Sequence, residues 1–174
     1  TEKAWELCEE YRLPRLIFVT NMDDDQASFR ELILKLEKRF GRKIAPFQVP
    51  IRENEKFVGF VNVVKMGGRR FTNLSDYEEC EIPEYTKKNL NIVRDALIEA
   101  VAETSEEYME RYFSGEEFTQ EEISAALREH VTEGNIVPVL MGSGVNAQGF
   151  SHLLQAIDKY FPSPDKFECV GVDV

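Results

Sequence analysis

Leu16-Ile17-Phe18-Val19 runs directly into Thr20-Asn21-Met22-Asp23, and this stretch decides the fold class. An apolar run rich in branched side chains, followed by polar residues, is typical of a buried strand that opens into a loop. The pattern recurs where Ile136-Val137-Pro138-Val139-Leu140-Met141 runs into Gly142-Ser143-Gly144. A helical pattern follows each strand, which predicts an α/β fold. Ligands of open α/β sheets bind beyond the carboxyl ends of the strands, so both loops are candidates for one site.

The hydrophobic periodicity divides the chain into a core and an insert. Helices are expected over residues 2–11, 26–40 and 149–161. The residues of the last helix that are expected to face the core are Phe150, Leu153, Leu154, Ile157 and Phe161. Between them we expect an antiparallel meander from about residue 44 to 71 and a polar loop over 73–83 with a short strand near Glu81. A long helix is expected over 85–112, and a second helix over 120–133, which begins with a Thr119–Glu122 capping box.

This β-then-α block interrupts the α/β alternation, so it reads as an inserted subdomain. The predicted organisation is a core from residues 1–45 and 135–162, an insert from 46–134, and a linker toward a next domain from 163–174.

Composition excludes several classes of protein. The net charge of −11 and the pI of about 4.8 argue against a surface that grips nucleic acid. The three cysteines are widely spaced without a Cys/His cluster, which favours reduced, mostly buried thiols in a cytoplasmic protein over a zinc site. No apolar run reaches the roughly 18 residues of a membrane span, so no membrane partner is expected.

Asp23 is the strongest candidate for a ligand-binding residue. Its carboxylate can accept two hydrogen bonds from a flat ring that carries adjacent donors. The alternative is that Asp23-Asp24-Asp25 merely complements a helix N-terminus. A calcium loop that starts at Asp23 fails, because its sixth residue is Ser28 and its twelfth is Leu34. His130 and His152 lack ligand partners nearby in the sequence and read as surface or hydrogen-bonded histidines, so no metal site is predicted.

Over essentially its whole length the chain resembles the second half of the GTP-binding domain of bacterial elongation factor G. The landmarks occur in one order and include the two strand-loop stretches, Val49-Pro50-Ile51, Phe57-Val58-Gly59, Val64-Lys65-Met66, Met109-Glu110-Arg111-Tyr112, and Leu153 to Pro164. The resemblance implies the carboxyl-terminal strands and helices of a P-loop GTPase three-layer sheet, with an inserted α+β subdomain that contains a small antiparallel sheet.

The resemblance also implies roles for individual residues. Asp23 would bind the N1–H and the exocyclic amine of guanine, and the N–H of Gly144, after Ser143, would approach the base oxygen. The family pattern Asn-Lys-x-Asp is Thr20-Asn21-Met22-Asp23 here. Thr20 can bridge the neighbouring loops only in part, and Asn21 is too short to lie along the nucleotide. This departure favours a divergent paralogue. The residues expected to bind GTP or GDP are Thr20, Asn21, Asp23, Ser143 and Gly144.

The phosphate-binding part of such a site is missing. The chain has no G-x-x-x-x-G-K-[ST] loop and no Asp-x-x-Gly switch segment before the first helix. Phosphate and Mg²⁺ ligands would come from a preceding half, so we expect this chain to be a piece of a longer protein. Alone it should hold no catalytic residue, bind nucleotide weakly or not at all, and hydrolyse no GTP.

Acidic residues crowd the insert. The resemblance implies that the insert contacts the flexible stalk protein of the large ribosomal subunit, and an acidic face would steer a basic partner. The acids expected at this contact are Glu99, Glu103, Glu106, Glu107 and Glu110; the alternative is an ordinary solvated helix face. Three functions remain open: a ribosomal translocase, a ribosome-protection or other paralogous GTPase, and a protein-binding module that no longer uses nucleotide.

Overall fold

The computed structural model describes residues 1–41, 43–72 and 76–163. The expected linker at 163–174 lies outside the described residues from residue 164 onward, and Cys169 lies there too. Within the described part of the chain, no helix is long and apolar enough to cross a membrane.

The core is a three-stranded parallel sheet. Its strands are β1 (Ile17–Val19), β2 (Ile44–Pro46) and β7 (Val137–Met141), in the order β1-β7-β2. The expected α/β fold with a separate antiparallel sheet is therefore confirmed. The expectation that the meander begins at Ile44 is wrong, because β2 pairs in parallel with β7, from Ile44 opposite Val137 to Pro46 opposite Val139.

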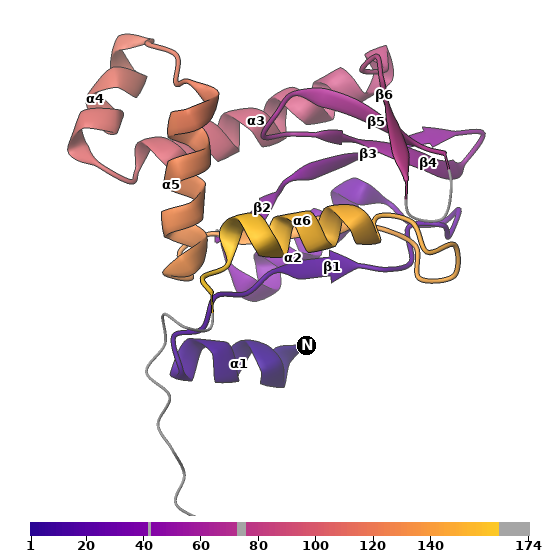
Figure 1. Ribbon diagram of the computed structural model, residues 1–174, viewed down its shortest axis with the longest axis horizontal. Helices are drawn as coiled ribbons and strands as arrows, with labels where there is room; N and C mark the ends of the chain where they lie inside the picture. Colours follow the sequence, from indigo (N-terminus) through magenta and orange to yellow (C-terminus); the bar gives the residue numbers. More distant parts are fainter. Residues whose placement is uncertain (42, 73–75, 164–174) are drawn as a thin grey trace, which may run out of the picture.

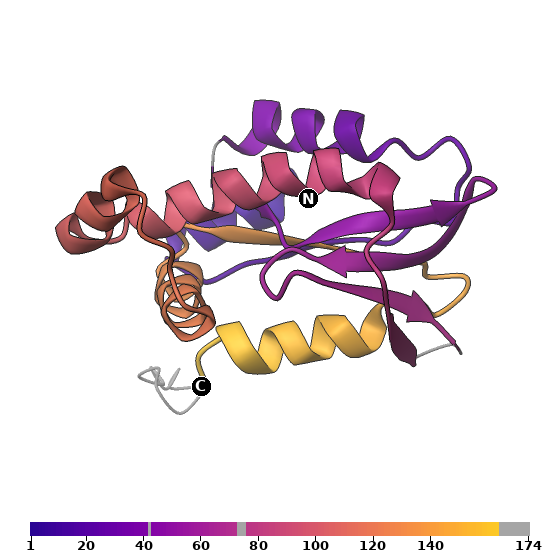
Figure 2. The ribbon, with the colours of Figure 1, turned by 90° about the horizontal axis from the view of Figure 1, so that it is seen from above.

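Helices cover both faces of this sheet. Figure 2 shows the parallel sheet between α2 (Phe29–Phe40) and α6 (Phe150–Tyr160). Successive residues of β7 serve the two faces in turn. Val139 packs in the cluster with residues of α2, and Leu140 packs in the cluster with residues of α6. Alternation of side chains along a fully buried strand explains why the whole strand is apolar.

Helix α6 presents a different face from the one that we expected. Its buried residues are His152, Ala156 and Tyr160, which recur every four positions on one side of the helix. Phe150, Leu154 and Ile157 were expected to point inward, but they are 37%, 66% and 41% exposed. The expectation is wrong for these three residues because the helix is rotated to bring the His152 stripe onto the core.

The described residues of the insert form a second sheet and the α-helices α3, α4 and α5 (Figure 1). Strands β3 (Gln48–Glu53), β4 (Lys56–Asn62), β5 (Gly67–Phe71) and β6 (Tyr77–Cys80) form an antiparallel sheet in sequence order. The strand expected near Glu81 is β6 and ends at Cys80. A 3₁₀ turn, η1 (Glu84–Thr86), leads into α3 (Lys87–Ala102), and α4 (Glu106–Ser114) and α5 (Gln120–Thr132) follow. Leu90, Leu97 and Val101 of α3 are buried in the shared core.

The single long helix expected over residues 85–112 is wrong. The chain leaves the helix after Ala102 and restarts at Glu106. Ser105 adopts an extended conformation, and its Oγ accepts a hydrogen bond from the backbone N–H of Tyr108 (3.1 Å). This N-cap starts α4 as a separate helix. The Thr119–Glu122 capping box is confirmed at the start of α5.

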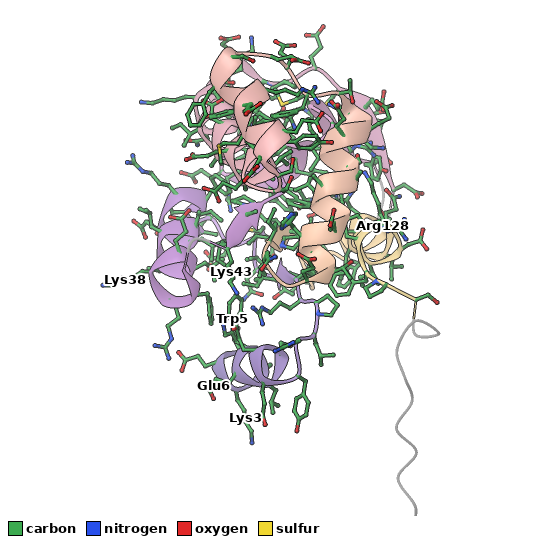
Figure 3. The ribbon with its side chains drawn as sticks, turned by 90° about the vertical axis from the view of Figure 1, so that its left-hand side faces the viewer. Lys3, Trp5, Glu6, Lys38, Lys43 and Arg128 are labelled. Carbon is green, nitrogen blue, oxygen red and sulfur yellow. The ribbon has the colours of Figure 1, made fainter. Side chains whose placement is uncertain are left out.

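Helix α1 (Glu2–Glu10) contacts the core through the ring of Trp5 and through ion pairs of Glu2 with Arg39 and of Glu9 with Arg15 and Lys43. Figure 3 shows Trp5 pointing from α1 toward the rest of the domain, whereas Lys3 and Glu6 point away. The Trp5 ring lies 4.5 Å from the ring of Phe40, and the guanidinium of Arg15 lies 4.1 Å from the Trp5 ring centroid. Cys8 of this helix and Cys80 of β6 carry free thiols, as expected, but both are partly exposed rather than buried.

Candidate functional site

The two strand-loop stretches meet at the carboxyl ends of neighbouring strands. Backbone hydrogen bonds join them: the N–H of Gly142 donates to Val19 (2.8 Å), that of Met22 donates to Gly142 (3.1 Å), and that of Gly144 donates to Thr20 (2.9 Å). Figure 1 shows the end of β1 and the loop before α6 at the same end of the molecule. The pairing of β1 with β7 therefore brings together the five residues that the sequence assigned to one site.

The Gly142–Gly149 loop folds back on itself as a compact turn. Ser143 and Gln148 exchange backbone hydrogen bonds (3.1 and 3.0 Å), and the buried Ser143 Oγ accepts the N–H of Asn146 (3.1 Å). A Cβ on Gly142 would lie 2.3 Å from the carbonyl oxygen of Gln148, so the turn requires glycine there. The structure therefore gives Ser143 the task of shaping the loop from inside.

The Thr20–Asp23 segment is anchored by one buried residue. Met22 is 1% exposed, whereas its neighbours Thr20, Asn21 and Asp23 are exposed. The Thr20 hydroxyl donates to Oδ1 of Asn21 (3.1 Å). The hydroxyl was expected to bridge the two loops in part, but the bridge runs through the Thr20 backbone carbonyl.

The expected donor at Gly144 is already engaged. Its N–H, which the resemblance directed at the oxygen of a base, donates instead to the Thr20 carbonyl. This bond holds the two loops together, and a ligand that used the Gly144 N–H would have to displace it. The next residue, Val145, is 88% exposed.

Asp23 does not serve the following helix. The N-cap of α2 is Ser28, whose Oγ accepts the N–H of Glu31 (3.4 Å). Asp24 holds the intervening turn, with its Oδ1 accepting the N–H of Gln26 (2.9 Å). Among the described residues, none donates a hydrogen bond to the Asp23 carboxylate. The start of α2 is therefore capped by Ser28, which lies outside the Asp23-Asp24-Asp25 run.

Arg52 is a site residue that the sequence analysis missed. It lies at a bulge in β3, and its Nη2 donates to the carbonyl oxygens of Met22 (2.7 Å) and Asp24 (3.1 Å). Its Nη1 donates to the carbonyl of Glu55 (2.7 Å). The Tyr85 hydroxyl contacts both the N–H and the carbonyl of Arg52 (3.1 and 2.7 Å). The insert thus holds the carbonyls on both sides of Asp23, a contact between distant segments that no local pattern reveals.

A groove of about 770 Å³ opens beside Asp23. Asp23, Asn146 and Gln148 line it from the core, while the insert contributes Lys56, Phe57, Val58, Arg70, Phe71 and Thr72. This volume is within the range of small-molecule sites. Arg70 is bound to Glu53, so Lys56 is the cation of this lining that forms no ion pair within the described residues. The groove makes the insert part of the wall around Asp23.

The acids expected to contact a partner lie together at the distal end of the insert, but not on one helix. Glu99 is on α3, Glu103 is in the break, and Glu106, Glu107 and Glu110 are on α4; all five are exposed. We call these five residues the acidic surface. Phe113, seven residues after Glu106 on α4, is 79% exposed and was not anticipated.

One cation braces the helices beside the acidic surface. Arg111 donates to both carboxylate oxygens of Glu122 (2.7 and 3.2 Å) and lies 3.0 Å from a carboxylate oxygen of Glu116. The hydrogen bonds from Arg111 and from Thr119 lower the pKa of Glu122 to about 2. Both acids are thereby engaged within the insert, which distinguishes them from the five residues of the acidic surface.

Comparison with known proteins agrees with this arrangement. Residues 1–163 match the family described as the elongation factor Tu GTP binding domain. A crystal structure of a protein from Thermus thermophilus is similar, with a TM-score of 0.85 and 33% sequence identity. That match covers 95% of this chain and 25% of the other, so the chain spans about a quarter of that protein's length. The chain belongs to the elongation factor Tu GTP-binding domain family, and so to the translational GTPases.

Proposed function

We propose that this chain is the base-reading half of the GTP-binding domain of an elongation factor G-type GTPase. Residues 1–45 and 135–162 form the carboxyl-terminal half of that domain, and residues 46–134 form an insert that contacts the ribosomal stalk. The observation that carries the proposal is the direct bonding of the Thr20–Asp23 segment to the Ser143–Gly144 loop at the ends of β1 and β7. Family membership and the match at 33% identity support it.

Asp23 discriminates between bases in this proposal. A carboxylate accepts from two adjacent donors, which guanine presents at N1 and at its exocyclic amine. Adenine offers no such pair on that edge, so it would leave the carboxylate unpaired. The exposure of Asp23, and its freedom from the capping role that Ser28 fills, support this assignment.

The base oxygen requires a donor from the second loop. Because the Gly144 N–H is bonded to Thr20, we assign this task to the backbone N–H of Val145, the exposed residue that follows. Ser143 shapes the turn, and Thr20 and Asn21 lie beside the base without the lysine stem of the family pattern. The cofactor is GTP or GDP, and the phosphates and Mg²⁺ belong to a part of the site that these residues do not supply.

The ribosomal contact is the second part of the proposal. Five exposed acids close together repel one another, and a basic partner relieves that repulsion. The exposed Phe113 beside them supplies an apolar anchor of the kind that protein interfaces favour. We assign the acidic surface and Phe113 to the stalk protein.

Turnover on ribosomes tests this contact. In the full-length protein, reversal of Glu103, Glu107 and Glu110 to Lys should slow stalk-dependent GTP hydrolysis, and the defect should shrink as salt screens the exposed charges. The matched control reverses Glu6, Glu10 and Glu37, exposed acids of α1 and α2 that form no ion pair within the described residues and lie far along the chain from α4. A folded triple variant with the wild-type rate at low salt would reduce the acidic surface to an ordinary solvated face.

Two alternatives make different predictions. A paralogous or ribosome-protection GTPase would keep guanine binding and ribosome-stimulated hydrolysis, and the altered Thr20-Asn21 pair favours this version over the housekeeping translocase. A protein-binding module that has lost nucleotide would bind the stalk without any preference for GDP over ADP. Equilibrium binding of GDP and ADP to the full-length protein separates the two.

A further inference from the structure

A small recess lies between the inserted sheet and helix α6, away from the Asp23 groove. Its volume is about 60 Å³, and it shares no lining residue with that groove. Two contacts join the inserted sheet to α6 here: the rings of Phe60 and His152 are 4.8 Å apart, and the Tyr77 hydroxyl donates to Gln155 Oε1 (3.3 Å). Its polar lining residues are Asn62, Lys65, Arg69, His152, Gln155 and Lys159.

His152 lines this recess and carries one ring nitrogen without a hydrogen-bond partner among the described residues. Oδ1 of Asn62 accepts the backbone N–H of Lys65 (2.8 Å), so its Nδ2 faces Nε2 of His152 at 3.5 Å. Nε2 is then the acceptor, and the proton of the neutral ring lies on Nδ1. Nδ1 is buried and has no partner among the described residues, and His152 is only 9% exposed. A surface or hydrogen-bonded histidine was expected; His152 is buried and hydrogen-bonded at Nε2, and only its Nδ1 is left without a partner among the described residues.

Three cations surround the same recess without acidic partners. Among the described residues, no carboxylate lies within ion-pair distance of Lys65, Arg69 or Lys159. Glu79 lies opposite Arg69 in the strand register, and Asp158 precedes Lys159 on α6. Arg69 lies over the Tyr77 ring and Lys159 donates to the Ser124 hydroxyl.

The charge of Lys65 lowers the pKa of both His152 and Lys159. Burial, followed by the charges of Arg69 and Lys65, lowers the pKa of His152 to about 4. Burial and the charge of Lys65 also lower the pKa of Lys159. His152 is therefore neutral at pH 7, and the charges of Lys65 and Arg69 act on the groups that line the recess.

We propose that this recess binds a phosphate group through Lys65, Arg69, Lys159 and the Nδ1–H of His152. Phosphate fits because the available polar groups are donors. The Gln155 carbonyl oxygen is occupied by Tyr77, so its amide N–H₂ remains as a further donor. A tetrahedral oxyanion can accept from several donors and cations at once. The overall negative charge disfavours a long polynucleotide, which makes inorganic phosphate or a small phosphorylated molecule the favoured source.

Nuclear magnetic resonance of the 174-residue chain tests the proposal directly. Inorganic phosphate is titrated at pH 7 against chloride of equal ionic strength, and the ¹⁵N resonances of the His152 ring and of the surrounding amides are followed. Saturable shifts confined to the recess are expected. Lys65→Ala and Lys159→Ala should each weaken binding about tenfold, as expected for a lost charge-assisted hydrogen bond. Lys88→Ala, at an exposed position on α3, removes the same charge and should leave the affinity unchanged.

The possible outcomes identify the source of the phosphate group and decide whether the recess binds it. If a short single-stranded RNA shifts the same residues at lower concentration than phosphate does, the group bound is a backbone phosphate and the recess is still the site. Shifts that do not saturate, that spread over the surface, or that Lys88→Ala reduces as much as Lys65→Ala does would overturn the proposal. Because the assay requires neither GTP nor ribosomes, its result does not depend on the proposed function.

Discussion

Arg52→Ala should loosen the segment that carries Asp23. The guanidinium donates two hydrogen bonds to this segment, at the carbonyls of Met22 and Asp24. A hydrogen bond to a charged group contributes about 1.5–3 kcal/mol when it is well shielded, and partial exposure of this pair reduces that to about 1 kcal/mol for each bond. The loss of both should destabilise the closed loop by about 2 kcal/mol, which is roughly a 30-fold change in its opening equilibrium.

Amide hydrogen exchange measures that opening. The amides of Met22, Asp24 and Ala27 donate to backbone carbonyls within or next to the segment, so their exchange reports on its closure. Their protection should fall about 30-fold in Arg52→Ala, and Arg52→Lys should recover only part of it because an ammonium lacks the planar fork. Arg30→Ala on α2, at an exposed position, is the matched control. Unchanged exchange at these amides in Arg52→Ala would refute the view that the insert holds the Asp23 segment.

Three further predictions concern single positions. Gly142→Ala should lower the free energy of unfolding, measured in urea, by about 1–3 kcal/mol, because its Cβ would lie 2.3 Å from the carbonyl oxygen of Gln148. For Gly144→Ala the free energy of unfolding should stay within about 0.5 kcal/mol of wild type, because its Cβ would lie 3.9 Å from the Thr20 Cβ. Equal losses in the two variants would contradict the loop geometry. The pKa of Glu122 is lowered from 4.5 to about 2, so its carboxylate contributes stability that is fully present above about pH 4.5 and is lost as the pH falls toward 2. The melting temperatures of wild type and Glu122→Gln should therefore differ at pH 6 and converge near pH 2. A difference in melting temperature that does not depend on pH would contradict the charge-based role. Asn21→Lys in the full-length protein should tighten GDP about fivefold by calorimetry, since a partly covered lysine stem contributes about 1 kcal/mol; unchanged affinity would mean that the site has been rebuilt in another way.

Elements with strong local signals were predictable from the sequence. The apolar runs that become β1 and β7, the Phe29–Phe40 periodicity of α2 and the Thr119–Glu122 capping box each depend on neighbouring residues, and each is present in the structure. The meeting of the Thr20–Asp23 and Ser143–Gly144 loops also followed, because parallel strands that are adjacent in a sheet bring their carboxyl ends together.

The remaining features depend on long-range contacts. The break between α3 and α4 rests on the Ser105 cap within a segment whose apolar spacing continues, so periodicity alone ran across it. The rotation of α6 is set by the packing of its His152 face against the inserted sheet. The sequence alone did not show this, because the apolar residues on the other side of the helix form an equally good stripe. Arg52 is 30 residues from Met22 in sequence, and its role appears only when β3 lies beside the first loop.

The central claim is that Asp23 reads a guanine base, and the most direct measurement is the base preference of Asp23→Asn in the full-length protein. Asparagine replaces one carboxylate acceptor by an N–H₂ donor, which mismatches the guanine amine but suits the carbonyl that xanthine carries in its place. Binding of GDP should weaken by about 100-fold, the loss expected when a charged hydrogen-bonding partner is removed, and xanthosine diphosphate should become the better ligand. If Asp23→Asn binds GDP as tightly as the wild type and gains nothing for the xanthine nucleotide, Asp23 does not contact the base and the account is wrong.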